Sequence, residues 1–422
     1  MSNSGASPHS VSHWLLFVGL VLVVALAAGA LLMPQVQDRL EWDWERLTAR
    51  VHDTLYPHSP LVSTPSAASL PPPALVVVLP TPSPDSSEPV TVAPGLTQVP
   101  TPTPWVLPSA YEIKGVPQNY QHPNNCGPAT LASDLTFWGW IGTQANIAAK
   151  LRPDERDRNV SPEDLAAYAQ GAGLKTLMRV GGSPELAKRI LNLGIPVIVE
   201  KATILAQDDP TGGGWAGHYT LLSGYSDQDK VFITQDSLEG PNLRIVYSTF
   251  INQWRPFNYL YLVVYPAARE ADVRAALAEA ADAQANFRQA ALLAQQETSS
   301  QTGEAQAFAW FNLGTNLNAL GDYAQAAQAF DQARQLGLPW RMLWYQFGPY
   351  DAYYHTGRFQ DLIQLADDTL AVRDSLKETF YWRGMARLAL GDKAGAVADW
   401  ESALEYNRNY APAADQLKAV GK

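Results

Sequence analysis

Apolar and polar positions follow different patterns in different parts of the chain. Residues 14–33 form a run of twenty residues without a charge, long enough to cross a hydrocarbon core of about 30 Å as a helix. We interpret this run as a single transmembrane helix that follows an N-terminal tail, residues 1–13. A cleaved signal peptide is the alternative, because residues 27–30 are small, but no Lys or Arg precedes the run.

The next segment has helical periodicity. Leu40, Trp44, Leu47, Val51 and Leu55 are separated by four, three, four and four residues, which places them on one face of a helix. This pattern predicts a juxtamembrane helix over residues 34–56, lying either along the membrane interface or in solvent.

A linker is expected over residues 57–109, which contain 15 of the 31 prolines, mixed with Ser and Thr. Such a composition cannot bury a core, and it predicts an extended spacer with polyproline character. Spacers of this kind commonly hold a domain away from a membrane surface.

Two arguments about the orientation of the predicted anchor disagree. Arg39, Arg46 and Arg50 follow the apolar run and no Lys or Arg precedes it, which favours a cytoplasmic C-terminal side. The Pro-rich spacer favours the opposite side. We expect a single-pass protein of the cell membrane whose folded regions are extracytoplasmic.

Residues 110–266 begin with helical patterns. Leu131, Leu135 and Trp138 recur at helical spacing. Ser161 and Ser183 each precede a proline and an acidic residue, a combination typical of a helix start.

Strand patterns follow later in the same region. They are expected in segments rich in β-branched and aromatic residues, namely 195–200, 218–225, 231–236 and 260–265. Helices followed by strands indicate an α+β domain with an antiparallel sheet in its second half.

No strand pattern follows residue 266. Residues 267–296 are Ala-rich and predict a helix. A repeat then appears in two sets of glycines spaced by 34 or 36 residues, namely Gly314, Gly348 and Gly384, and Gly321, Gly357 and Gly391. This period resembles tetratricopeptide (TPR) repeats.

We therefore expect an all-α domain over residues 267–422, with three stacked TPR-like repeats that form a concave groove. Residues 267–296 would be a preceding helix or a degenerate repeat. The Trp and Tyr residues clustered in 340–354 are expected to pack between repeats, and only secondarily to form a ligand surface. A nonrepetitive helical bundle is the alternative.

The composition excludes several classes of protein. With 46% hydrophobic and 17% charged residues, the chain is neither a multi-span membrane protein nor wholly disordered. A formal net charge of -11 argues against nucleic acid as a partner, because phosphate binding requires clustered Lys and Arg. Cys126 is the one cysteine, which excludes an intrachain disulfide and a multi-Cys zinc site.

Cys126 stands at the start of a predicted helix. Unpaired backbone N–H groups and the positive end of the helix dipole favour a thiolate at this position. Gly127 lets the backbone approach a substrate, and Pro128 suits a first helical turn. The sequence therefore indicates a nucleophile, with an inert buried thiol as the alternative.

A thiolate enzyme also requires a base and a group that orients this base. His218 begins a predicted strand, and Asp236 closes the next one. Adjacent antiparallel strands bring the two together only if their register allows it, which spacing alone does not decide. His122 is the other candidate base, but it lies in a Pro-Asn loop and is expected at the surface.

These motifs together resemble the papain-like cysteine peptidases of family 39, relatives of the bacteriocin-processing, double-glycine leader peptidases. The resemblance covers residues 111–266 and rests on Cys-Gly-Pro-Ala at a helix start, His-Tyr at a strand start and Asp at the end of the next strand. It implies a catalytic triad with Cys126 as nucleophile, His218 as general base and acid, and Asp236 as the group that orients the imidazole.

The resemblance also implies a glutamine just before the nucleophile that stabilises the oxyanion. Gln121 is our choice, and Gln118 is the less favoured candidate. The relatives usually have this glutamine six residues before the cysteine, where this chain has Tyr120, and a proline after the aspartate, where it has Ser237.

The implied reaction is acyl transfer without a metal or an organic cofactor. We expect a membrane-anchored cysteine peptidase that hydrolyses peptide bonds in a peptide or protein substrate, with TPR repeats that recruit a protein partner. The alternative is a catalytically inactive peptide-binding module of the same fold, acting as a membrane-tethered scaffold.

Overall fold

The structure, a computed structural model, describes residues 61–65, 105–205 and 214–422. The predicted N-terminal tail, transmembrane helix and juxtamembrane helix, and most of the predicted linker, lie outside these ranges. Among the helices of the described ranges, none combines the length and the apolar character needed to cross a membrane.

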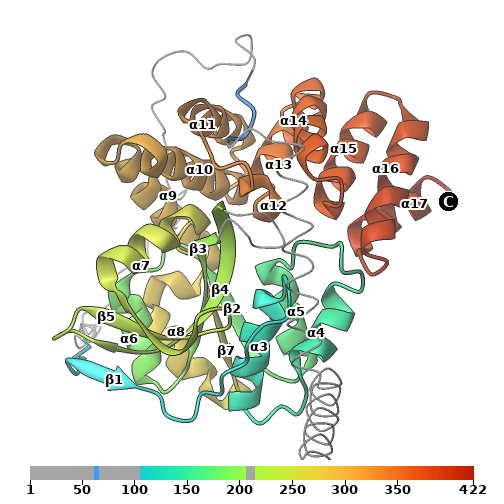
Figure 1. Cartoon of the computed structure of the whole chain (residues 1–422). Helices are drawn as coiled ribbons and strands as arrows, with labels where there is room; N and C mark the ends of the chain where they lie inside the picture. The colour runs from blue at the N-terminus through green and yellow to red at the C-terminus, as the bar shows by residue number, and fades with distance from the viewer. Residues whose placement is uncertain (1–60, 66–104, 206–213) are drawn as a thin grey trace, which may run out of the picture. The chain divides into compact units, whose positions relative to one another are not determined.

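Residues 110–266, called the α+β region below, contain the strands of the described chain (Figure 1). The strands are β1 (Ala110–Glu112), β2 (Lys175–Arg179), β3 (Val197–Leu205), β4 (Gly214–Ser226), β5 (Val231–Asp236), β6 (Gly240–Val246) and β7 (Tyr261–Tyr265). They form one sheet in the order β2-β7-β3-β4-β5-β6, with β1 paired to β4. The pairs β1–β4, β2–β7, β3–β7, β4–β5 and β5–β6 are antiparallel.

Helices cover both faces of this sheet. They are α3 (Cys126–Phe137), α4 (Gln144–Leu151), α5 (Pro162–Gly171), α6 (Pro184–Asn192), α7 (Tyr247–Trp254) and the short η2 (Arg255–Phe257). One face packs on the helices α3 to α5, through a core that includes Leu131, Leu165 and Leu221. The opposite face packs on α6 and α7, through a core that includes Ile190, Val199 and Phe250.

The predicted helix starts are confirmed, and the reason is local. Ser161 and Ser183 are the N-caps of α5 and α6, and each side chain accepts a hydrogen bond from a backbone N–H three residues later. A proline occupies the first turn of each helix, where its missing N–H costs no hydrogen bond.

All four predicted strands are present, but the sheet is not confined to the second half of the region. The prediction missed β1, β2 and β6. The last two, β2 and β6, are the edge strands. Polar residues such as Lys175, Asn242 and Arg244 occupy exposed positions in them, which weakens the apolar pattern that identifies a strand.

Residues 267–422, called the helical region below, are helical throughout, as predicted. The helices are η3 (Ala267–Arg269), α8 (Glu270–Leu277), η4 (Ala278–Ala281), α9 (Ala283–Ser300), α10 (Gly303–Ala319), α11 (Tyr323–Leu336), α12 (Met342–Tyr345), α13 (Gly348–His355), α14 (Phe359–Val372), α15 (Lys377–Ala389), α16 (Lys393–Tyr406) and α17 (Ala411–Ala419). The helix predicted over 267–296 is interrupted, because Ala278 has a left-handed φ of 52°.

The glycine period has a structural cause. Gly321, Gly357 and Gly391 follow the ends of α10, α13 and α15, and their φ angles of 83°, 71° and 88° suit a residue without Cβ. A Cβ at Gly314 would lie 2.8 Å from the Phe330 ring, so α10 and α11 pack closely at this position. The assignment of this array as TPR repeats stays a prediction.

Part of the predicted linker contacts the helical region. Val62 donates its backbone N–H to the carbonyl of Leu338 at 2.9 Å, and Arg334 Nε donates to the carbonyl of Ser63 at 2.9 Å. The Val62 side chain is buried in the core of the helical region. Residues 61–65 are therefore held by this region, which the composition of the linker does not predict.

Candidate active site

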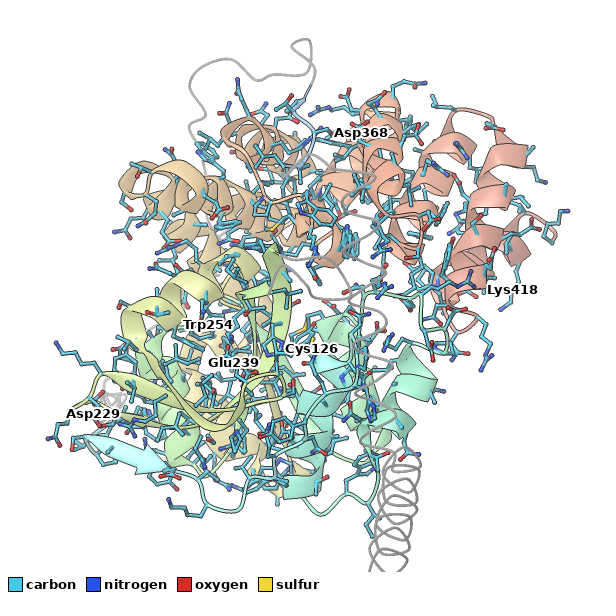
Figure 2. All side chains as sticks on the ribbon, in the orientation of Figure 1. Cys126, Asp229, Glu239, Trp254, Asp368 and Lys418 are labelled. Carbon is cyan, nitrogen blue, oxygen red and sulfur yellow. The ribbon has the colours of Figure 1, made fainter. Side chains whose placement is uncertain are left out.

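Cys126 is the first residue of α3, as the sequence predicts, and it is a free, half-buried cysteine. A Cβ at Gly127 would lie 3.3 Å from the ring of Tyr219 on β4. The first turn of α3 thus packs directly against Tyr219, which follows His218 in β4. Figure 2 labels Cys126 at this junction of helix and sheet.

The structure brings His218 and Asp236 together. Asp236 lies opposite Thr220 in the β4–β5 pair, so His218 is its diagonal neighbour on the same face of the sheet. The distance between His218 Nε2 and Asp236 Oδ1 is 2.9 Å, and the side chains are only 4% and 0% exposed. Backbone N–H groups of Leu238 and Glu239 also donate to Oδ1, at 3.0 and 3.1 Å.

Electrostatics couple this pair to Cys126. Burial alone would raise the pKa of Cys126, but the hydrogen bond with His218 and the positive charge of its ring lower it below the ordinary value. Burial alone would lower the pKa of His218, but the charge and hydrogen bond of Asp236 raise it to about 9. Both shifts favour a thiolate next to an imidazolium.

The carboxylate of Asp236 is held in its charged form. Burial opposes the charge, but His218 and the nearby Lys201 hold the pKa of Asp236 well below its usual range. A carboxylate that stays ionised can orient the imidazole and stabilise its positive charge.

The structure distinguishes the two candidate glutamines. Gln118 Nε2 donates to the backbone carbonyl of Asp236 at 2.7 Å, so one of its two N–H donors is engaged. Gln121 accepts at Oε1 from the Ser237 hydroxyl at 2.9 Å, and its backbone N–H donates to the Ser237 carbonyl. Because Ser237 holds Oε1, the amide of Gln121 presents its donor, Nε2, on the other side. The oxyanion role of Gln121 stays a prediction.

Sequence reasoning missed Lys201 and Glu200. Lys201 Nζ lies 3.7 Å from Asp236 Oδ2, and both side chains are almost completely buried. Glu200 is 4% exposed, and burial, followed by the charge of Cys126, raises its pKa well above the ordinary value. The sequence signal that could have identified them is a pair of charged residues inside β3, a strand whose other residues are apolar except for Thr203.

A network behind Cys126 connects the two regions. Asn125, the N-cap of α3, accepts at Oδ1 from Arg152 Nη1 at 3.4 Å, and Arg152 Nε donates to the carbonyl of Asp157 at 3.2 Å. Asp157 in turn binds two residues of the helical region, Lys377 Nζ and Asn407 Nδ2, each at 2.8 Å. The loop after α4 therefore joins the helical region to the residue before Cys126.

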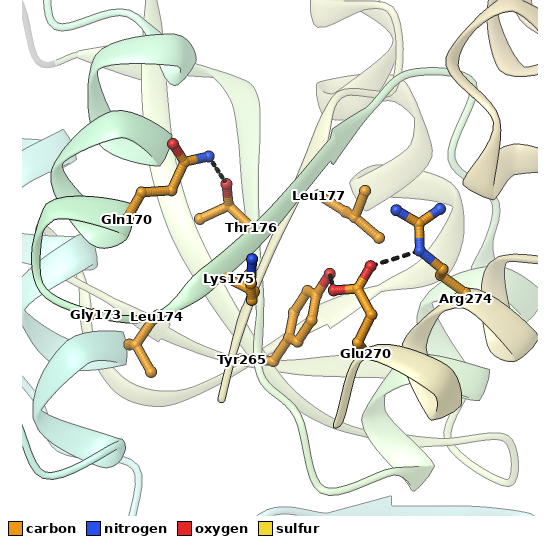
Figure 3. Close-up of a pocket in the computed structure, with 9 residues that line it drawn as sticks. All are labelled: Gln170, Gly173, Leu174, Lys175, Thr176, Leu177, Tyr265, Glu270 and Arg274. Atoms are coloured by element: carbon orange, nitrogen blue, oxygen red, sulfur yellow. Dashed lines mark hydrogen bonds and ion pairs between the residues drawn. The ribbon is translucent and has the colours of Figure 1, made fainter. Parts of the chain in front are cut away.

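The exposed His122 and a cavity along β2 both lie outside the group formed by Cys126, His218 and Asp236. His122 is exposed, as expected for a loop residue. A cavity of about 530 Å³ lies along the edge strand β2, lined by residues that include Lys175, Tyr265, Glu270 and Arg274 (Figure 3). Across the described ranges, no cluster of three or more His, Cys, Asp or Glu side chains could hold a metal ion.

Comparison with known proteins bears on the α+β region. Residues 111–262 match the Peptidase_C39 like family. No curated protein matches the chain.

Three solved structures are similar to this chain. A protein described as a C39-like peptidase from Bacillus anthracis is 16% identical, with a TM-score of 0.31 over 37% of this chain and 96% of that chain. The peptidase domain of Streptococcus ComA, a bi-functional ABC transporter, is 19% identical, with a TM-score of 0.28 over 36% and 98%. A double glycine motif protease from an AMS/PCAT transporter, in complex with the leader peptide, is 17% identical, with a TM-score of 0.26 over 37% and 94%.

The family match lies in the region that contains Cys126, His218 and Asp236. The family match shows that residues 111–262 of this chain are similar to C39-like peptidases.

Proposed function

We propose that this chain is a cysteine peptidase that hydrolyses peptide bonds through Cys126, His218 and Asp236. The observation that carries the proposal is the buried hydrogen bond of 2.9 Å between His218 Nε2 and Asp236 Oδ1, next to the residue that begins α3. Because Nε2 faces Asp236, the other ring nitrogen, Nδ1, exchanges the proton with the Cys126 sulfur.

The reaction proceeds by acyl transfer. The Cys126 thiolate attacks the scissile carbonyl, and the backbone N–H of Cys126 and Gln121 Nε2 stabilise the oxyanion. His218 protonates the leaving amine as the C–N bond breaks, which leaves a thioester on Cys126. His218 then takes a proton from water, whose attack on the thioester releases the second product and restores the thiolate.

We also propose that the helical region is a TPR array that recruits a protein partner, and that residues 14–33 anchor the chain in the cell membrane with its folded regions outside the cytoplasm. The glycine period supports the first statement, and the uncharged run with its Pro-rich spacer supports the second.

The triad is tested by the pH dependence of Cys126 alkylation with iodoacetamide. The chain has one cysteine, so the intact mass reports on one site. The lowered pKa predicts half-maximal rate below the free-thiol value of about 8.5. In His218→Ala the hydrogen bond and charge are lost and burial remains, so we expect a higher pKa and a rate at pH 7 that is lower by about tenfold or more.

The matched control is His122→Ala, which removes an exposed imidazole four residues before Cys126 and should leave the profile unchanged. Slow alkylation that His218→Ala does not alter would exclude the triad. Fast, His218-dependent alkylation without hydrolysis of a quenched-fluorescence peptide library would instead favour the peptide-binding alternative.

A further inference from the structure

The helical region reaches the strand that carries His218. Trp215 of β4 and Phe257 of η2 stack with ring centroids 5.7 Å apart. Phe308 of α10 lies 6.2 Å from Trp215, and Tyr345 of α12 lies 6.1 Å from Trp215 and 6.0 Å from Phe257. We call these four residues the interregion aromatic cluster, since each region contributes two of them.

Tyr345 packs against the backbone just before His218. A Cβ at Gly217 would lie 3.1 Å from Tyr345 Cγ and Cδ1, and 2.8 Å from Phe257 Cζ. The absence of a side chain at Gly217 is therefore what lets the ring of Tyr345 lie this close to the strand. Tyr345 itself is only partly buried, so some of its side chain remains accessible.

Tyr345 also lies within electrostatic range of the nucleophile. Burial is the main cause that raises the pKa of Tyr345 to about 12, and the negative charges of Cys126 and Glu200 act in the same direction. Arg341 and a hydrogen bond from the backbone of Gly217 act against them. A residue more than two hundred positions from Cys126 in the sequence thus belongs to its surroundings.

We propose that Tyr345 is a specificity-determining residue that the helical region contributes to the substrate cleft, where its ring forms a wall against Gly217, the residue before His218. The inference rests on the proposed peptidase function. Because Trp215 and Tyr345, the half-buried rings of the interregion aromatic cluster, lie at this wall, the subsite next to it accepts an apolar side chain of the peptide rather than an acidic one.

The test uses the full chain and two kinds of thiol reagent. Peptidyl chloromethyl ketones that end in Leu or in Asp occupy the cleft before they alkylate Cys126, whereas iodoacetamide is too small to require it. We expect the wild type to react faster with the Leu reagent than with the Asp reagent. In Tyr345→Ala this Leu-to-Asp ratio should fall by about tenfold, while the iodoacetamide rate stays within about twofold.

Matched variants separate the wall from a structural role. Tyr345→Phe keeps the ring and should keep the ratio. Tyr323→Ala removes a tyrosine of the same region that stacks on His355, with centroids 4.1 Å apart, and should have no effect. If Tyr345→Ala does not fold, Tyr345→Trp provides the readout, because a larger ring narrows the subsite and should slow the Leu reagent relative to an Ala reagent.

Other outcomes overturn the inference. An unchanged ratio in a folded Tyr345→Ala protein shows that the ring does not contact the peptide. An equal loss with both reagents and with iodoacetamide shows that Tyr345 acts on the position of His218 through Gly217. A wild type that reacts as fast with the Asp reagent as with the Leu reagent excludes the apolar subsite. Alkylation that does not depend on His218 overturns the proposed function, and this inference with it.

Discussion

Individual side chains at the candidate site have separable roles. Asp236 Oδ1 accepts from His218 and from two backbone N–H groups, so its position is set by the chain around it. The buried ammonium group of Lys201 lies 3.7 Å from the other carboxylate oxygen, Asp236 Oδ2. The two glutamines differ in what holds them, since Gln118 uses its donor group on the Asp236 carbonyl and Gln121 uses its acceptor on Ser237.

This difference predicts the effect of replacing each glutamine. In Gln121→Ala we expect kcat for a quenched peptide to fall by about 10² to 10³, because one donor to the oxyanion is lost in the transition state. KM should change little. Alkylation of Cys126 by iodoacetamide should be unaffected, since this reaction forms no oxyanion.

Gln118→Ala is the matched control, with an expected loss in kcat of less than tenfold. A larger loss of kcat in Gln118→Ala than in Gln121→Ala would reverse the assignment of the oxyanion glutamine.

At the scale of elements, one irregularity in the β4–β5 pair sets the geometry of the site. Tyr225 lies opposite Phe232, but after the bulge between Leu222 and Gly224 the register shifts by one, so that Asp236 lies opposite Thr220. Without the shift Asp236 would lie opposite Leu221. Because a one-residue slip exchanges the faces of a strand, the bulge decides that Asp236 and His218 share a face.

The loop after α4 also depends on a contact far away in the sequence, because a buried ion pair holds it to α15. Lys377 Nζ binds Asp157 Oδ1 at 2.8 Å, and the side chains are 2% and 1% exposed. We expect Lys377→Met to lower the free energy of unfolding by about 3 to 5 kcal/mol, because it leaves a buried carboxylate uncompensated. Urea unfolding followed by tryptophan fluorescence measures this change.

Lys418→Met is the control for the loss of a lysine. Lys418 Nζ binds Asp415 Oδ1 at 3.3 Å, but both side chains are largely exposed, at 75% and 69%, so a loss of less than about 1 kcal/mol is expected. Equal unfolding midpoints for the two variants would show that the buried pair does not stabilise the loop.

At the scale of the whole molecule, the α+β region and the helical region contact each other, although they follow one another as separate segments of the sequence. Residues of the helical region bind the loop behind Cys126 and pack against the strand of His218. A segment of the predicted linker, residues 61–65, is also held by the helical region. Recruitment of a partner to this region would therefore act close to the candidate active site.

The proposed orientation of the chain is tested in cells that express it with a C-terminal epitope tag. We expect externally added protease to remove the tag from intact cells, because the spacer and the folded regions are proposed to lie outside the cytoplasm. A cytoplasmic marker protein should resist digestion until the cells are lysed. Digestion of the tag only after lysis would contradict the extracytoplasmic assignment.

Local features of this protein could be predicted from its sequence. Ser161 and Ser183 precede helices because a hydroxyl caps a nearby backbone N–H group. The start of α3 at Cys126 has no such cap, since Asn125 makes no capping hydrogen bond. The glycine period predicts the helix pairs, because a glycine with a left-handed φ follows the first helix of each pair and so recurs once per pair. The edge strand β2 escaped prediction, since an exposed strand does not need an apolar pattern.

The sequence by itself thus determined four of the strands, the helix starts at Cys126, Ser161 and Ser183, and the residue types and order of the candidate triad. Only the tertiary structure decided that a bulge brings His218 to Asp236, that Ser237 orients Gln121, and that Tyr345 lies against Gly217. The reason is physical. Caps and turns depend on neighbours in sequence, whereas strand register and side-chain contact depend on residues far apart in the chain that only packing brings together.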